Sequence, residues 1–232
     1  PTAICQDLTV QLDASGAGSI TASQVNNGSF DNCVITTLAL DKMNFTCADV
    51  GANTVTMTVT DINGNTGTCT STVTVQDNVA PIAICQDLTV QLDASGAGSI
   101  TAAQVDNGSS DNCSIDTMTL DQTDFTCADI GTKTVTLTVT DVNGNTSTCT
   151  STITVEDNVA PIALCQNLTV QLDATGAGSI TAAQVDNGSS DNCSIDTMTL
   201  DQTDFTCADV GANTVTMTVT DANGNVSTCT ST

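Results

Sequence analysis

The chain has 232 residues, of which 26 are Asp or Glu and two are Lys or Arg, so its formal net charge at pH 7 is -24. This charge opposes binding to nucleic acid and to anionic lipid, because both present phosphates. His, Trp and Tyr are absent and only four Phe occur, so the most common general base and the usual stacking platforms for bases and sugars are missing. We therefore expect neither an enzyme nor a nucleic-acid-binding protein.

The first 80 residues predict a series of short β-strands. "DLTVQL" and "SITA", separated by the flexible "DASGAG", form an early pair of strands, and "VITTLAL" and "NFTC" supply the middle ones. Thr54–Asp61 then alternates apolar with β-branched polar residues, which buries Val55, Met57 and Val59 and turns the threonines outward. Thr68–Val75 has a similar alternation, and the "NGN" between these two runs is turn chemistry for a hairpin. Six or seven such strands indicate a β-sandwich of immunoglobulin type.

The same pattern recurs along the chain with a fixed period. Cysteines fall at 5, 33, 47 and 69, then at 85, 113, 127 and 149, then at 165, 193, 207 and 229, and "FTCAD" and "NGN" occur in every copy. Self-similarity of this kind indicates tandem modules. We predict an all-β chain of three immunoglobulin-like β-sandwich modules in a linear array, at residues 1–80, 81–160 and 161–232. The third module is truncated at its C-terminal strand, so we expect the chain to be part of a longer surface protein or fibre.

No apolar run approaches the roughly 20 residues that a membrane-spanning helix requires. We therefore expect no membrane insertion in this segment.

Twelve cysteines without histidine or a short C-x-x-C pair predict disulfides rather than zinc sites. Disulfides persist in oxidising compartments, which places the protein outside the cell or on its surface. Four cysteines per module allow three pairings. Because the first and last strands of such sandwiches often run side by side, we favour Cys5 with Cys69, which leaves Cys33 with Cys47. The equivalent pairs are Cys85 with Cys149 and Cys113 with Cys127 in the second module, and Cys165 with Cys229 and Cys193 with Cys207 in the third.

Three phrases make the chain resemble the hyalin repeat, or HYR, family. They are "DNVAPIAICQDLTVQLDASGAGSITAAQVDNGSSDNC", "FTCADIGTKTVTLTVTDVNGNTSTC" and "TITVEDNVAP". The resemblance covers essentially the whole chain and is to the tandem form found in large secreted and surface proteins of bacteria. It implies an immunoglobulin-like extracellular module associated with adhesion, with a role in reach, attachment or matrix structure and no catalysis.

A calcium site is predicted at each joint between modules. In a sandwich of this type the acidic linker, the loop after "SITAAQV" and the "NGN" turn meet at the end where the chain enters the module. Their carboxylate, amide and carbonyl oxygens are the ligands that Ca²⁺ prefers, and the linker also resembles the acidic connector of cadherins, although the domain does not match that family. The predicted ligands are Asp77, Asn78, Asp111, Asn112, Asp141, Asn143 and Asn145 at the first joint, and Glu156, Asp157, Asn158, Asp191, Asn192, Asp221, Asn223 and Asn225 at the second. The alternative is a polar turn and a hydrated linker, since Asn and Gly are also ordinary turn formers.

Covalent glycans are a second predicted addition. "DTM" at 116–118 and 196–198 resembles an O-glycosylation signal of some gram-negative bacteria, which nominates Thr117 and Thr197. Among the N-x-S/T sequons we nominate Asn27, Asn107 and Asn187. The alternative for the threonine-rich strands is plain β propensity.

These features favour a structural or adhesive extracellular repeat array, stiffened by calcium and carrying glycans. Its partners are neighbouring copies of the same module or chain. The alternative is a calcium-dependent adhesin module that binds a surface glycan or ice through one face. No module carries an insertion that would build a ligand patch, and near-identical modules favour repetition itself as the function.

Overall fold

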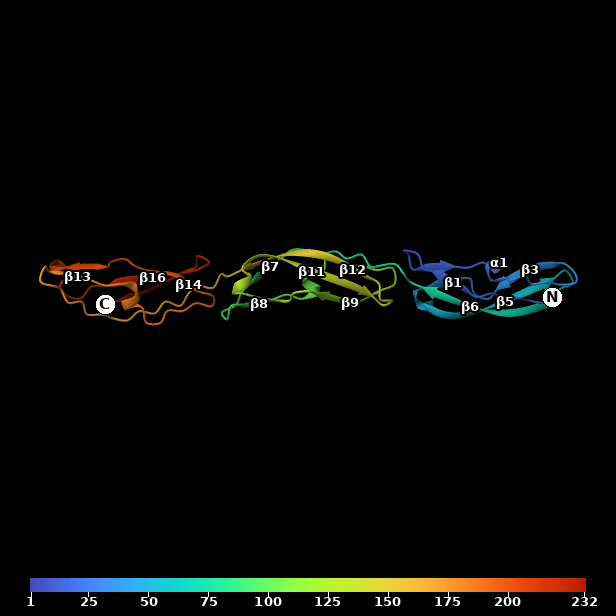
Figure 1. Ribbon diagram of the computed structural model, residues 1–232, viewed down its shortest axis with the longest axis horizontal. Helices are drawn as coiled ribbons and strands as arrows, with labels where there is room; N and C mark the ends of the chain where they lie inside the picture. Colours follow the sequence, from blue (N-terminus) through green and yellow to red (C-terminus); the bar gives the residue numbers. More distant parts are fainter. The chain divides into compact units, whose positions relative to one another are not determined.

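The computed structural model describes residues 1–232 as an all-β chain of three repeated β-sandwich modules in tandem (Figure 1). Modules 1, 2 and 3 denote the three sequence repeats. None of the helices is long and apolar enough to cross a membrane. The chain forms two compact units, one of Pro1–Cys85, Asp106–Leu120 and Thr136–Thr150, the other of Gln86–Val105, Asp121–Val135 and Ser151–Thr232. Because the unit boundaries cut through module 2, the module boundaries at residues 80 and 160 stay a prediction.

Module 1 packs a four-stranded sheet, with strand order β1-β6-β5-β3, against a two-stranded sheet of β2 and β4. The long hairpin of β5 and β6 forms the centre of the larger sheet. The elements are β1 (Leu8–Gln11), β2 (Ala17–Ser19), α1 (Ala22–Val25), β3 (Ile35–Leu40), β4 (Asn44–Thr46), the 3-10 turn η1 (Cys47–Asp49), β5 (Gly51–Asp61) and β6 (Thr66–Gln76).

The predicted pairing of the first two strands is wrong. β1 runs parallel to β6, with Leu8 opposite Val73, and β2 pairs with β4 instead. Most of "SITA" is not a strand, because the next residues form the single helical turn α1. The side chain of Gln24 accepts a hydrogen bond from the Thr21 N–H at 2.7 Å, a capping-box contact that favours a helical start over an extended strand.

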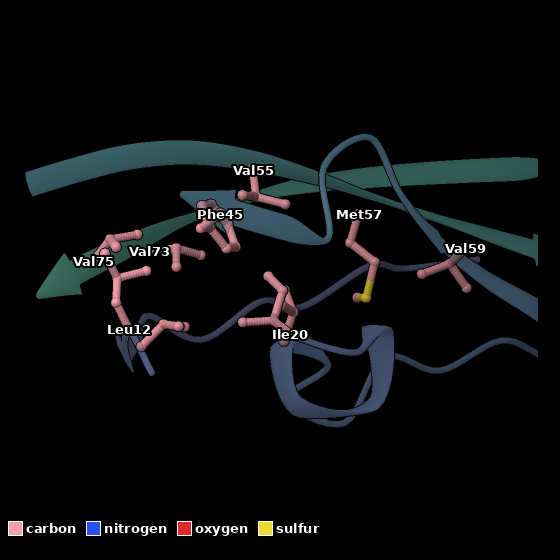
Figure 2. Packing of buried hydrophobic residues seen from close by; sticks show 10 residues of the cluster. Leu12, Ile20, Phe45, Val55, Met57, Val59, Val73 and Val75 are labelled. Atoms are coloured by element: carbon pink, nitrogen blue, oxygen red, sulfur yellow. The ribbon is translucent and has the colours of Figure 1, made fainter. Parts of the chain in front are cut away.

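The core of module 1 lies between its two sheets. Val55, Met57 and Val59 of β5 are fully buried, as their alternation predicts. Phe45 of β4 and Ile20 are buried in the same cluster, and Figure 2 shows Val55 beside Phe45. The intervening threonines are more exposed, so one face of β5 packs into the core together with buried residues of β1, β4 and β6.

Modules 2 and 3 repeat this architecture. Module 2 has a four-stranded sheet of order β7-β12-β11-β9 and a two-stranded sheet of β8 and β10. In module 3 the larger sheet has only three strands, of order β14-β16-β17, beside the pair β13 and β15. Module 2 comprises β7 (Leu88–Gln91), β8 (Ala97–Ser99), α2 (Ala102–Val105), β9 (Ile115–Leu120), β10 (Asp124–Thr126), η2 (Cys127–Asp129), β11 (Gly131–Asp141) and β12 (Thr146–Glu156). Module 3 comprises β13 (Ala177–Ser179), α3 (Ala182–Val185), β14 (Ile195–Leu200), β15 (Asp204–Thr206), η3 (Cys207–Asp209), β16 (Val215–Asp221) and β17 (Val226–Ser231).

The single buried aromatic side chain of module 1 should dominate its packing. Phe45 is 1% exposed, whereas Phe30 of the same module is 59% exposed. We expect Phe45→Ala to lower the free energy of unfolding of module 1 by about 3–5 kcal/mol, since it removes a large buried side chain and leaves a cavity. Phe30→Ala is the matched control and should change it by less than about 0.5 kcal/mol. Calorimetric unfolding measures both, and equal effects of the two substitutions would contradict this core.

Candidate metal centre at the joints

Three carboxylates from distant parts of the chain meet where module 1 joins module 2. Asp77 follows β6 in the linker, Asp111 lies in the loop between α2 and β9, and Asp141 ends β11. One carboxylate oxygen of each residue lies within 4.8 Å of the others. All three belong to the same compact unit. The second joint has the same arrangement, formed by Asp157, Asp191 and Asp221 within the other unit.

The hairpin turn after β11 holds the linker in place. Asp141 Oδ1 accepts the backbone N–H groups of Asn143 and Asn145, each at 2.8 Å. The Asn145 amide donates to Asp141 Oδ2 at 2.8 Å and to the Asp77 carbonyl at 3.1 Å. Gly144 has φ +89°, a backbone conformation that this turn requires and that glycine adopts without a steric cost. The "NGN" sequence therefore forms the turn and also fixes the neighbouring module's linker.

The cluster at the first joint has oxygens without any hydrogen-bond partner. Asp77 Oδ2, Asp111 Oδ1 and Asn112 Oδ1 are all buried and unpartnered. Asp77 is 5% and Asp141 1% exposed. Burying an unpaired polar oxygen costs free energy, and like charges at this separation repel each other. At the second joint the unpartnered atoms are Asp157 Oδ2, Asp191 Oδ1 and Asn192 Oδ1.

No cationic side chain of the chain compensates these charges. Its two lysines, Lys42 and Lys133, pair with Asp49 and Asp129. A bound cation would satisfy the unpartnered oxygens, and an all-oxygen set with several carboxylates suits Ca²⁺, which takes 6–8 oxygen ligands. The residues present therefore fit the ion, and Asp77, Asp111, Asn112 and Asp141 would hold it at the first joint.

Hydrogen bonding keeps one of these carboxylates ionised. Burial alone would raise the pKa of Asp141, but the bonds from the Asn145 side chain and from the N–H groups of Asn145, Asn143 and Gly144 outweigh it and lower the pKa below its ordinary value. Charged acceptors are favoured by such bonds. Asp141 is therefore ready to bind a cation without first losing a proton.

Several of the predicted ligands have other hydrogen bonds. The Asn78 amide donates to Gln11 Oε1 at 2.6 Å, along the edge of module 1. Asn143 is exposed, and its backbone N–H, not its side chain, contacts Asp141. Glu156 accepts a hydrogen bond from the Gln91 side chain at 2.6 Å. The Asn158 amide contacts Gln91 and the Asn223 backbone N–H contacts Asp221 in the same way, and these residues stay predicted ligands: Asn78, Asn143, Glu156, Asn158 and Asn223.

Each joint also contains a disulfide between consecutive modules. Cys47 bonds to Cys113, and Cys127 bonds to Cys193. The predicted pairs Cys33 with Cys47, Cys113 with Cys127 and Cys193 with Cys207 are therefore wrong, and Cys33 and Cys207 are free thiols. The other predicted pairs form within their modules, as Cys5–Cys69, Cys85–Cys149 and Cys165–Cys229.

The length of β5 explains this correction. Cys33 lies near the Asn63 side chain, just beyond the end of β5, whereas Cys47 precedes the start of the same strand. A strand of 11 residues spans about 33 Å or more. A disulfide requires Cα atoms less than about 7 Å apart. Cysteines at opposite ends of one sandwich cannot meet, so Cys47 bonds instead to Cys113 at the adjoining end of the next module.

A glycine turn of module 1 touches this disulfide. The Asn112 amide donates to the Asp13 carbonyl at 3.2 Å. A Cβ added at Gly16, which has φ +74°, would lie 2.7 Å from Cys47 Sγ and 2.8 Å from the Asn112 carbonyl oxygen. The Gly96 turn of module 2 has the same contacts with Cys127 and Asn192. Glycine thus permits the close approach of two modules at each joint.

Cross-module bonding is the feature that the sequence interpretation missed. The sequence does contain a sign of this bonding, because the two pairs have the same separation of 66 residues, Cys47 with Cys113 and Cys127 with Cys193. Assigning each cysteine to one end of its module would have identified the pair.

No known protein family matches the chain, and no curated protein matches its sequence, so membership of the hyalin repeat family stays a prediction. Among solved structures, human CDH23 EC21-23 is 14% identical with a TM-score of 0.37, and covers 97% of this chain and 98% of its own. Mouse cadherin-23 EC22-24 is 15% identical with a TM-score of 0.37, over 98% of this chain and 95% of its own. Protocadherin Gamma B7 extracellular cadherin domains 1-4 are 13% identical with a TM-score of 0.33, over 98% of this chain and 74% of their own. With identities and TM-scores this low, we infer the function of this chain from its own residues.

The contact at Gly16 gives a test of the joint. Gly16→Ala and Gly176→Ala both place alanine at positive φ, which costs about 1–2 kcal/mol. Only at Gly16 does the new methyl also meet a neighbouring module's backbone, because Gly176 faces the free Cys207 alone. We expect the larger loss of unfolding free energy for Gly16→Ala, measured by denaturant titration. A loss no greater than that of Gly176→Ala would show that this close approach is absent in solution.

Proposed function

We propose that the chain is a structural and adhesive segment of an extracellular repeat array in which Ca²⁺ fixes each joint between modules. The observation that carries this proposal is the set of buried, unpartnered oxygens at each joint. They come from the linker and from the module that follows it, so one ion would hold that module to the linker that leaves the last strand of the preceding one. Five disulfides favour an oxidising, extracellular location.

Charge explains why the ion would stiffen the joint. Without a cation, the carboxylates of Asp77, Asp111 and Asp141 repel one another in a site that excludes most water. That repulsion favours withdrawal of the linker from the loop and the hairpin turn. When bound, Ca²⁺ supplies the neutralising charge and a shared coordination centre. The Cys47–Cys113 bond keeps the modules connected in either state, so the ion governs rigidity rather than attachment.

The likeness of the two joints supports a structural and adhesive role that depends on repeating one module. Both joints have the same buried carboxylates, the same amide donors and the same type of disulfide. An array of this kind can gain reach by adding modules without changing the design of the joint. The hyalin repeat resemblance, with its link to adhesion and surface attachment, is part of this proposal.

Calcium should stabilise the chain through these clusters. At a free concentration one hundred times the Kd, an ion that binds only the folded joint contributes about 2.7 kcal/mol. We expect millimolar Ca²⁺ to raise the melting temperature and EDTA to reverse the rise. In isothermal titration, the wild-type chain should bind one ion at each of its two clusters, and Asp77→Asn should remove one of them.

Asp116→Asn is the matched control, because Asp116 is an exposed aspartate of module 2 outside the cluster. It should leave both sites intact. A melting curve that is the same in Ca²⁺ and in EDTA would sink the calcium proposal and leave a hydrated linker held by the disulfide.

Glycans are the second part of the proposal. The nominated acceptors are all exposed, so an enzyme can reach them; they are Thr117, Thr197, Asn27, Asn107 and Asn187. A glycan coat would protect the exposed strand faces and add polar surface to a chain with only two basic residues. We expect intact-mass spectrometry of the natural material to give a mass above that of the bare polypeptide. A mass equal to the polypeptide would exclude the modification.

A further inference from the structure

Two cation ligands of the first joint share one short loop with a cysteine of the joint disulfide. Asp111, Asn112 and Cys113 are consecutive and lie between α2 and β9. Asp111 Oδ2 accepts the Cys113 N–H at 2.9 Å, while Asp111 Oδ1 and Asn112 Oδ1 are buried without a partner. The hydrogen bond to Cys113 therefore orients the Asp111 carboxylate and leaves its other oxygen available to an ion.

The other half of this disulfide belongs to the preceding module. Cys47 begins η1, directly after β4, and packs against the buried cluster of module 1. Its Sγ lies 3.5 Å from the Asn112 carbonyl oxygen. Cys113, although part of module 2, packs against the same cluster. The disulfide thus attaches the ligand loop of module 2 to the core of module 1.

The linker ligand Asp77 leaves module 1 on the same side. It directly follows β6, the strand that pairs with β1 and β5. Asp77 Oδ1 accepts the Asn112 amide at 3.1 Å, and Asp77 Oδ2 has no partner. Module 1 therefore positions both Asp77 and Cys47, and the disulfide fixes the loop of module 2 relative to them.

Repulsion between the carboxylates acts against this arrangement. Asp77, Asp111 and Asp141 each have one oxygen within 4.8 Å of the others, and like charges at this distance repel. The Asn112 amide bonds to the Asp13 carbonyl and to Asp77 Oδ1, but single hydrogen bonds of this kind are weak. The covalent S–S bond keeps the ligands together before an ion arrives, and a preorganised site binds more tightly.

We propose that the joint disulfide regulates the cation site, so that each joint binds Ca²⁺ tightly only while its disulfide is oxidised. Reduction of Cys47–Cys113 releases the loop of Asp111 and Asn112 from module 1. Repulsion then separates this loop from the linker, and the first joint loses affinity for the ion. This inference rests on the proposed calcium sites and adds their regulation.

The second joint has the same contacts. Asp191 Oδ2 accepts the Cys193 N–H at 2.9 Å, and the Asn192 amide donates to Asp157 Oδ1 at 3.1 Å. The Asn192 carbonyl oxygen lies 3.6 Å from Sγ of Cys127, the partner of Cys193 in the disulfide. The same dependence on the disulfide therefore applies to both joints.

Reduction of the joint consumes two electrons and two protons, which a small dithiol such as dithiothreitol supplies. The S–S bond of the joint breaks and two thiols form, while the dithiol closes to a cyclic disulfide by way of a mixed disulfide. Coupling between two equilibria is reciprocal. Bound Ca²⁺ must therefore oppose reduction by the same factor by which reduction weakens Ca²⁺ binding.

Isothermal titration of Ca²⁺ into the full chain tests the first half of this coupling. Cys47→Ser combined with Cys113→Ser removes the disulfide of the first joint, and the second joint keeps its own as the control within the same chain. We expect one ion to bind as in the wild type and the other at least about tenfold more weakly, within the usual range of coupling between sites. Two ions bound with wild-type affinity would overturn the inference and leave the calcium sites standing. A wild-type chain that binds no Ca²⁺ would overturn both.

The reduction potential of the wild-type disulfides tests the second half without a substitution in the joint. The chain is equilibrated in dithiothreitol redox buffers, with Ca²⁺ or with EDTA, and mass spectrometry counts the alkylated thiols at each cysteine. We expect Ca²⁺ to lower the potential of Cys47–Cys113 by about 30 mV or more, which is the tenfold factor converted for a two-electron couple. Asp77→Asn should abolish this shift at the first joint and retain it at the second.

The disulfide within module 1 is the matched control for this measurement. Cys5 bonds to Cys69, which lies opposite Met57 in the β5–β6 hairpin, and both cysteines belong to one module. Its potential should shift less than that of the joint. Equal shifts of the two bonds, or no shift at the joint, would overturn the regulation by the disulfide.

Discussion

The joint between modules depends on one constraint: carboxylates from a linker, a loop and a hairpin turn are buried together with oxygens that have no partner. Hydrogen bonds within the protein leave Asp77 Oδ2, Asp111 Oδ1 and Asn112 Oδ1 without a partner, and the two lysines pair with other aspartates. Burial makes the repulsion stronger than it would be at the surface, because water screens it less. A divalent cation would neutralise the repulsion between the carboxylates and would be bound by the linker, the loop and the hairpin turn together. The ion would therefore determine how rigidly two modules are held together.

The rest of each module serves to bring these groups together. The β5–β6 hairpin, with its threonine–valine alternation, forms the core and extends from one end of the sandwich to the other. Its turn contains Asn65, which corresponds to Asn145 and Asn225 in the following modules. The side-chain amides of Asn145 and Asn225 donate hydrogen bonds to the linker carbonyls of Asp77 and Asp157. The glycine turn at Gly16 allows the cross-module disulfide to close against the backbone. The length of the sheet, the residues of the hairpin turn and the positions of the cysteines therefore together determine how consecutive modules join.

Local patterns made much of this predictable. The alternation in Thr54–Asp61 fixed the buried face of β5, and the fixed period predicted that both joints would be alike. The meeting of Asp77, Asp111 and Asp141 followed from placing loops at one end of a sandwich. The contacts of Asn78 and Asn143 could not be predicted in advance, because composition does not tell which way a side chain points. The pairing of Cys33 with Cys47 failed for a different reason, since closeness in sequence was given more weight than the length of the strand between the two ends.

An experimental density map of the chain in calcium, with anomalous scattering recorded from a lanthanide substituted for the ion, tests the central claim most directly. The account predicts one peak at each joint, about 2.3–2.6 Å from oxygens of Asp77, Asp111 and Asp141 at the first and from their counterparts at the second. Joints without a peak, with water molecules or a lysine from elsewhere satisfying Asp77 Oδ2 and Asn112 Oδ1, would contradict it.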